Sequence, residues 1–184
     1  AGLRMNALVL SVSTAVTSVF IPRMSRYYVD GEQARFLGLL VKSFRITLVL
    51  MFPLCVFVIL NAPDVLCFVC GEEFLSATPT LVILMICALV LAVTNLLGNQ
   101  VLVPKNMEKR YSQSVFIGMF INLGLDMLLI PRFSSAGAAF ATLVTESFNV
   151  FWMGCGCKGE IRYISRSISF RKYFLPMICA VAAG

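Results

Sequence analysis

Histidine is absent from the 184-residue chain, and charged residues make up only 13% of it. Without imidazole, a histidine-based catalytic triad, a histidine metal site and a histidine proton relay are all excluded. Soluble domains average about 25% charged and roughly 45–50% apolar residues, whereas apolar residues reach 59% here. The mean hydropathy of +0.90 agrees with this excess. The composition therefore excludes a soluble enzyme, a disordered tail and a disulfide-stapled secreted domain, and it favours a membrane protein.

Long apolar runs give the organisation of the chain. They cover residues 3–22, 44–61, 79–103, 113–131, 136–157 and 173–184, the last of them truncated. A helical span needs about 20 residues, and these runs lack the polar–apolar alternation of barrel strands. We therefore predict an all-α integral membrane protein, a polytopic helical bundle that forms a single transmembrane domain over residues 1–184. A start without Met, directly in an apolar run, predicts a fragment of a longer protein.

Basic residues alternate between the loops. Thirteen of the fifteen lysines and arginines lie in three alternate loops, residues 23–45, 104–111 and 158–172. The two loops between them, 62–78 and 132–135, hold a single basic residue. Because cytoplasmic loops are enriched in Lys and Arg, we predict that the three basic loops are cytoplasmic and that Ala1 lies outside. The basic excess thus reports membrane orientation, and no nucleic-acid partner is expected.

Two of these loops are predicted to carry local structure. Residues 26–44 fit an amphipathic helix on the inner membrane surface, with Phe36 and Phe44 on its apolar side. Residues 62–78 contain Pro63 and Gly71, and Pro79 follows directly; these residues predict a bend with a short interfacial turn.

The first span carries a polar stripe. Its members recur at steps of three and four residues and therefore share one helix face: Arg4, Ala7, Ser11, Thr14 and Ser18. Two interpretations stay open for this face. Small residues allow neighbouring helices to pack closely. Alternatively, the face lines a polar substrate cavity, with Arg4 near its outer mouth.

Two acidic residues fall inside later spans. Asp126 follows Asn122 by four residues in the fourth span, and Glu146 precedes Asn149 by three in the fifth. An ionised carboxylate inside a bilayer costs at least about a few kcal/mol unless it is paired, hydrated or protonated. We therefore expect these acids to couple transport to H+ or Na+, or to contribute charge to a cavity that Asn122 and Asn149 also line. A purely structural partnership with a neighbouring helix stays open.

The cysteines predict no cofactor. Cys67-x-x-Cys70 stands alone, with neither a second pair nor a histidine, so a zinc site is not expected. A disulfide between these two thiols is left open. No catalytic residue and no metal ligand is assigned.

Three stretches resemble signatures of one family of membrane transporters. Ile21-Pro22-Arg23-Met24-Ser25 resembles a segment that ends in Pro-x-x-Ser. Residues 68–77 resemble Phe-Gly-x-x-Tyr-x-x-Ala, and residues 130–142 resemble Pro-x-Tyr-Gly-x-x-Gly-Ala-Ala-x-Ala-Thr, with Ser134 in place of a glycine. Their order and spacing resemble the C-terminal half of a Wzx-type flippase for lipid-linked oligosaccharides. The superfamily of these flippases also includes lipid II flippases and multidrug/cation antiporters.

The resemblance implies a two-lobe helical fold around a central cavity, with this chain as most of the second lobe. It implies alternating access, in which a sugar-phosphate head group crosses inside the cavity while its lipid tail stays in the bilayer. The implied partners are the bilayer and an undecaprenyl-diphosphate-linked repeat unit of a surface polysaccharide. The implied location is the bacterial cytoplasmic membrane, crossed several times. An anionic head group needs cationic and hydroxyl partners, which the polar stripe of the first span offers.

Two other functions stay open. A multidrug or metabolite/cation antiporter of the same superfamily fits Asp126 and Glu146. A membrane polysaccharide polymerase or ligase is the second alternative. It fits less well, because the short outer loops hold a single basic residue, Arg132.

Overall fold

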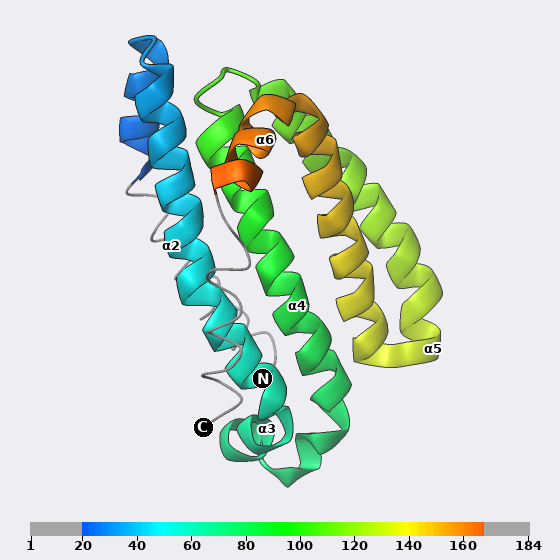
Figure 1. The fold of residues 1–184 in the computed structure, drawn as a ribbon. Helices are drawn as coiled ribbons and strands as arrows, with labels where there is room; N and C mark the ends of the chain where they lie inside the picture. Colours follow the sequence, from blue (N-terminus) through cyan, green and yellow to red (C-terminus); the bar gives the residue numbers. More distant parts are fainter. Residues whose placement is uncertain (1–19, 168–184) are drawn as a thin grey trace.

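Every regular element of the computed structural model is helical over residues 20–167, the part of the chain that it describes (Figure 1). A helix over residues 20–29 is followed by α2 (Gln33–Leu60), α3 (Ala62–Cys70), the 3-10 helix η1 (Glu72–Ala77), α4 (Thr78–Asn95), the π-helix η2 (Leu96–Leu102), α5 (Glu108–Gly156) and α6 (Lys158–Ser167). Three segments are long and apolar enough to cross a membrane: Gln33–Leu60, Glu72–Leu102 and Glu108–Gly156. The prediction of an all-α polytopic membrane bundle is confirmed. The apolar runs 3–22 and 173–184 lie outside the described residues, apart from residues 20–22.

Helix α2 is longer than the apolar run that predicted it. Its 28 residues make about 42 Å of helix, against roughly 30 Å for the hydrocarbon core of a bilayer. The separate surface helix predicted over residues 26–44 is wrong. The chain turns at Gly31, whose φ is +74°, and residues 33–44 then continue unbroken into the span. The reason is that Phe36 and Phe44 pack into the core rather than onto a membrane surface.

The segment after α2 is more helical than the predicted bend. α3 and η1 fill residues 62–77, and Gly71 separates them. Gly71 has φ +91° and ψ +165°, a region that is open essentially only to glycine. Pro63 lies in the first turn of α3, where the missing N–H of proline has no partner to lose. The outer turn is therefore a short pair of helices with a glycine break.

Helices α2 and α4 pack together along much of their length. Near α3 they share one core cluster, which contains Met51, Cys55, Val58, Ala62, Leu66, Leu81, Met85, Ala88 and Ala92. Toward the other end, a second cluster joins α2 to η2 and includes Leu40, Phe44, Leu97, Val101 and Met153. Apolar residues recur every three or four positions on both helices, so the two stripes stay in contact over several turns.

Helix α5 is a hairpin. The helical conformation is interrupted at Ser134, whose φ of +49° and ψ of −127° are not helical angles. Two antiparallel arms meet near Ser134 (Figure 1). At the turn, a Cβ on Gly137 would stand 2.5 Å from the carbonyl oxygen of Leu129, so this close approach requires glycine. The arms coincide with the apolar runs 113–131 and 136–157.

The loops that are rich in basic residues gather at one end of the bundle. Figure 1 shows the turn before α2, the loop after η2 and α6 at this end, and α3 at the opposite end. An ion pair between Lys105 and Glu160 joins the loop to α6. Arg110 donates hydrogen bonds of 3.2 and 3.0 Å to the carbonyl oxygen of Trp152, which joins the two arms of α5. This arrangement is the one expected of a multi-pass membrane protein; that the basic end faces the cytoplasm stays a prediction.

Candidate functional site

The candidate residues divide into two groups. Arg4, Ser11, Thr14 and Ser18, the polar stripe of the first span, lie outside the described residues. Asn122 and Asp126 lie on the first arm of α5, and Glu146 and Asn149 lie on the second arm. The structure therefore bears on the second group, which comes from the paired arms of a single hairpin.

A buried hydrogen bond joins the two arms. The Ser114 hydroxyl donates to Oδ1 of Asn149 at 2.8 Å, with both side chains buried. Gly118, one turn further along the first arm, faces the same residue: a Cβ there would stand 2.9 Å from Asn149 Oδ1 and 3.1 Å from Thr145 Cγ2. The Ser114 hydroxyl thus fixes the Asn149 side chain by a hydrogen bond, and Gly118 leaves space for that side chain.

Glu146 extends this polar cluster toward α4. Its partly buried carboxylate lies beside the side chains of Asn149 and of Thr94 on α4, and Cys87 is also nearby. The carboxylate oxygen Oε2 is buried and has no hydrogen-bond partner among residues 20–167. We refer to Ser114, Glu146, Asn149 and Thr94 as the hairpin cluster. It combines one ionisable group with neutral hydrogen-bonding groups between spans, an arrangement that can accept a proton or face a polar cavity.

Asp126 and Asn122 do not join this cluster. Asn122 lies one turn and Asp126 two turns beyond Gly118, toward the turn of the hairpin, and both are partly buried. The Asp126 oxygen Oδ1 is buried and has no partner within the described part of the chain. The structure therefore brings Glu146 and Asn149 together and leaves Asp126 as a separate acidic position.

Two basic residues that were predicted to lie in a loop are part of a long helix. Lys42 and Arg45 are exposed side chains of α2, on the side away from the buried residues Phe44 and Thr47. About 20 residues counted back from the end of α2 at Leu60 reach position 41, so Arg45 lies about one turn inside the span. The uninterrupted apolar period across residues 36–47 was the signal that could have placed them on the helix.

Three polar residues outside the hairpin cluster are fully buried. Ser43 and Thr47 on α2 and Gln100 on η2 are at most 1% exposed. Their four side-chain polar atoms have no hydrogen-bond partner in the described residues. Other helix hydroxyls, such as Thr145, donate to the carbonyl oxygen one turn earlier, at 2.9 Å in that case. Ser43 and Thr47 do not, so their hydroxyls are available to another polar group in this layer of the bundle.

The second and third signature stretches meet in space. A cavity of about 390 Å³ lies between them and is lined by Leu66, Phe74, Ala77, Thr80, Leu81, Leu84, Ser135, Ala138, Ala139 and Thr142. Phe74 and Ala77 come from residues 68–77, and Ala138 and Thr142 come from residues 130–142. The hydroxyl groups of Thr80 and Ser135, which both line the cavity, lie 3.0 Å apart. Its walls are mainly apolar.

The cysteines show no paired or metal-binding arrangement within residues 20–167. Cys67 and Cys70 are free thiols, as are the four others described, and no cluster of potential metal ligands occurs among these residues. Burial raises the pKa of the Cys157 thiol, with a further contribution from the nearby Glu160 carboxylate. Because the thiolate is the reactive form, Cys157 is expected to be poorly reactive at neutral pH.

Comparison with known proteins gives two matches. The family model for the lipid II flippase MurJ matches residues 8–184. The chain is also similar to the probable low-salt glycan biosynthesis flippase Agl15 of Haloferax volcanii, with 26% identity over 146 residues. That alignment covers 79% of this chain but 31% of the relative, so the chain spans about a third of the relative's length. No solved structure matches the chain.

Proposed function

We infer that this chain, which belongs to the lipid II flippase MurJ family, is part of a transporter that moves a lipid-linked glycan precursor across a membrane. The match of the family over residues 8–184 is the observation that carries this function. Members of the family are transporters rather than enzymes, so the polymerase or ligase alternative is set aside.

The proposed substrate is an oligosaccharide repeat unit linked to undecaprenyl diphosphate, used for a surface polysaccharide. Two observations support this choice over lipid II: the resemblance to Wzx-type flippases and the similarity to a relative that is named as a glycan biosynthesis flippase. We propose alternating access between two lobes, of which this chain supplies most of the second. The proposed location is the bacterial cytoplasmic membrane, although the similar relative comes from an archaeon.

Lys42 and Arg45 on α2 are proposed to attract the diphosphate of the head group. Both are exposed on the side of α2 that faces away from the core, and Arg45 lies inside the span. A cation at that depth is costly in lipid and is favoured where it meets water or an anion. Arg and Lys are the side chains that bind phosphate most strongly. Together with the proposed cavity stripe of Arg4, Ser11, Thr14 and Ser18, they would give the head group a polar path.

Glu146 and Asp126 are proposed to couple this movement to H+ or Na+. Each acid has a buried carboxylate oxygen without a hydrogen-bond partner among the described residues. Such an oxygen can bind a proton or a small cation. Asn149 follows Glu146 by three residues and Asn122 precedes Asp126 by four, and both asparagines carry a neutral side-chain oxygen. The same acids would serve the alternative function, a multidrug or metabolite/cation antiporter.

Reconstitution of the full-length parent protein separates these functions. Lipid-linked oligosaccharide is placed in proteoliposomes, and the rate at which its sugar becomes accessible to an external glycosidase is measured. The parent should raise that rate, and K42Q/R45Q should lower it severalfold, while K109Q, an exposed lysine at the same end of the bundle, should leave it unchanged. No flipping by the parent, together with cation-driven drug exchange, would assign the antiporter function instead.

A further inference from the structure

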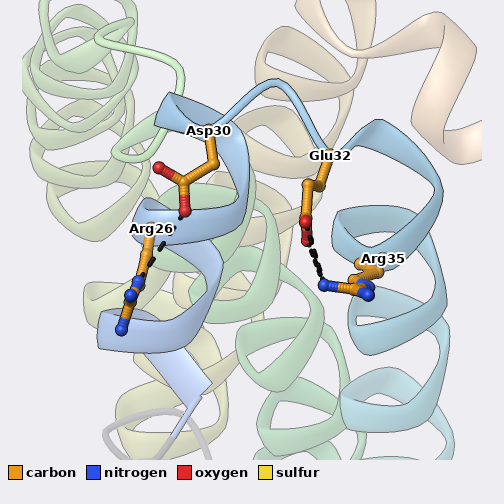
Figure 2. A network of polar contacts seen from close by, with 4 residues as sticks. All are labelled: Arg26, Asp30, Glu32 and Arg35. Carbon is orange, nitrogen blue, oxygen red and sulfur yellow. Dashed lines mark hydrogen bonds and ion pairs between the residues drawn. The ribbon is translucent and has the colours of Figure 1, made fainter.

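A pocket with three arginines lies at the turn before α2. It has a volume of about 320 Å³ and is lined by Arg23, Arg26, Tyr27, Asp30, Glu32 and Arg35. Figure 2 shows four of these side chains around the turn. Three guanidinium groups face two carboxylates, so the pocket has a formal charge of +1. We refer to it as the arginine pocket.

The ion pairs in the arginine pocket are local and exposed. Arg26 Nε lies 3.7 Å from Asp30 Oδ2, with 83% of the Arg26 side chain exposed. Arg35 Nη1 lies 2.8 Å from Glu32 Oε2, with 69% of the Arg35 side chain exposed. Each pair joins residues one turn apart, and neither bridges the two helices (Figure 2). Exposed pairs of this kind contribute little to stability, so these guanidinium groups can exchange a carboxylate for another anion at small cost.

Arg23 supplies a guanidinium without a competing acid. It is exposed, and it has no carboxylate within ion-pair distance in the part of the chain that the structure describes. Guanidinium groups bind phosphate oxygens through two parallel hydrogen bonds. A phosphate group is therefore the ligand that best fits the donors of this pocket.

The depth of the arginine pocket points to a lipid as the source of that phosphate. The pocket lies where α2 begins, and the roughly 42 Å of α2 match the about 40–45 Å of a bilayer measured with its head-group layers. Tyr27 lines the pocket, and the ring of Tyr28 lies 5.8 Å from the ring of Phe36 in a tilted arrangement. Tyrosines in such a position are typical of the head-group zone. Basic pockets between membrane helices bind the head groups of anionic phospholipids.

We propose that the arginine pocket binds the phosphate of an anionic membrane phospholipid. Arg23 and Arg26 on the first helix and Arg35 on α2 hold the phosphate between the two helices. Asp30 and Glu32 compete with it and thereby set the affinity. The inference concerns the bulk lipid and is independent of the substrate that is transported.

Native mass spectrometry of the full-length parent tests the proposal, with phosphatidylglycerol as the probe and phosphatidylcholine as the neutral reference. The parent should retain phosphatidylglycerol preferentially, and R23Q/R26Q should lower that retention about fivefold or more. R162Q provides the matched control, because Arg162 is an exposed arginine at the same end of the bundle but outside the pocket. It should leave retention unchanged.

A variant that is expected to bind more lipid distinguishes a direct effect on binding from misfolding. D30N/E32Q removes both competing carboxylates and should raise phosphatidylglycerol retention severalfold. Three results would overturn the proposal: equal retention in R23Q/R26Q, equal loss in R162Q, or displacement of the lipid by millimolar inorganic phosphate, which would identify a site for soluble phosphate. Because binding is measured without transport, its failure is distinct from a failure of the flippase function.

Discussion

Glu146 holds a carboxylate between two spans with one oxygen, Oε2, left without a partner among residues 20–167. If this acid couples transport to an ion, E146Q should reduce flipping at least about tenfold in the full-length parent while membrane expression and thermal stability persist. The physical reason is that Gln keeps the contacts with Thr94 and Asn149 but cannot bind or release a proton. The measurement is flux in proteoliposomes together with the melting temperature in detergent.

A structural role for Glu146 predicts a different pair of results. If the carboxylate serves mainly as a helix partner, E146Q should lower the melting temperature and leave flux per folded molecule unchanged. E73Q is a suitable control, because Glu73 is exposed on η1 and should change neither quantity. Wild-type flux with E146Q would remove the coupling role.

Two glycines on the first arm of α5 allow a matched test of the hairpin cluster. A Cβ at Gly118 would stand 2.9 Å from Asn149 Oδ1, whereas a Cβ at Gly124 would meet nothing within 4 Å. G118A should therefore displace Asn149, weaken its bond with Ser114 and lower the unfolding free energy by about 1–3 kcal/mol. G124A should be neutral or stabilise the helix by up to about 1 kcal/mol. Equal unfolding free energies in the two variants would contradict this packing.

At the scale of residues, polar side chains inside an apolar run could be recognised as candidates from the sequence, because they are costly in lipid. Glu146 and Asn149 stand out in an apolar run, and the structure places them side by side. Lys42 and Arg45 looked like loop residues, because charge alone does not show where a helix begins. Ser43 and Thr47 were missed because a hydroxyl group on a helix is unremarkable until its burial, with at most 1% of the residue exposed, is known.

The break between α3 and η1 depends on one backbone conformation. Gly71 has φ +91° and ψ +165°, and a side chain in that region costs of order 1–3 kcal/mol. G71A should therefore destabilise the outer turn and increase amide hydrogen exchange over residues 62–77. G38A is the control, because Gly38 lies within α2 and its Cβ would meet nothing within 4 Å. Unchanged exchange in G71A would contradict the described turn.

At the scale of elements, the periodicity of apolar residues located the helices but did not predict the residues at which they begin and end. The runs 113–131 and 136–157 match the two arms of α5, because each is bounded by polar or turn-forming residues. The start of α2 was misplaced because charged residues on the exposed side of residues 33–44 masked the apolar side that packs against η2. Only tertiary packing decides whether such a helix lies on a membrane surface or continues through the bilayer.

For the whole molecule, two native cysteines at opposite ends report the orientation. Cys67 on α3 and Cys155 near the end of α5 are both exposed. If the basic end is cytoplasmic, a membrane-impermeant maleimide should label Cys67 in intact cells and should label Cys155 only after permeabilisation. Variants of the parent that keep a single cysteine make the result unambiguous. Labelling of Cys155 in intact cells, with Cys67 protected, would reverse the predicted orientation.

Deletion of the parent gene, followed by extraction of lipid-linked oligosaccharides, tests the flippase function most directly. The chain belongs to a family of lipid flippases over residues 8–184. Loss of the parent should therefore leave its substrate on the leaflet where it is made. The expected result is accumulation of a complete repeat unit on the inner leaflet, together with loss of surface polysaccharide. An unchanged pool of lipid-linked oligosaccharide with altered drug sensitivity would contradict it.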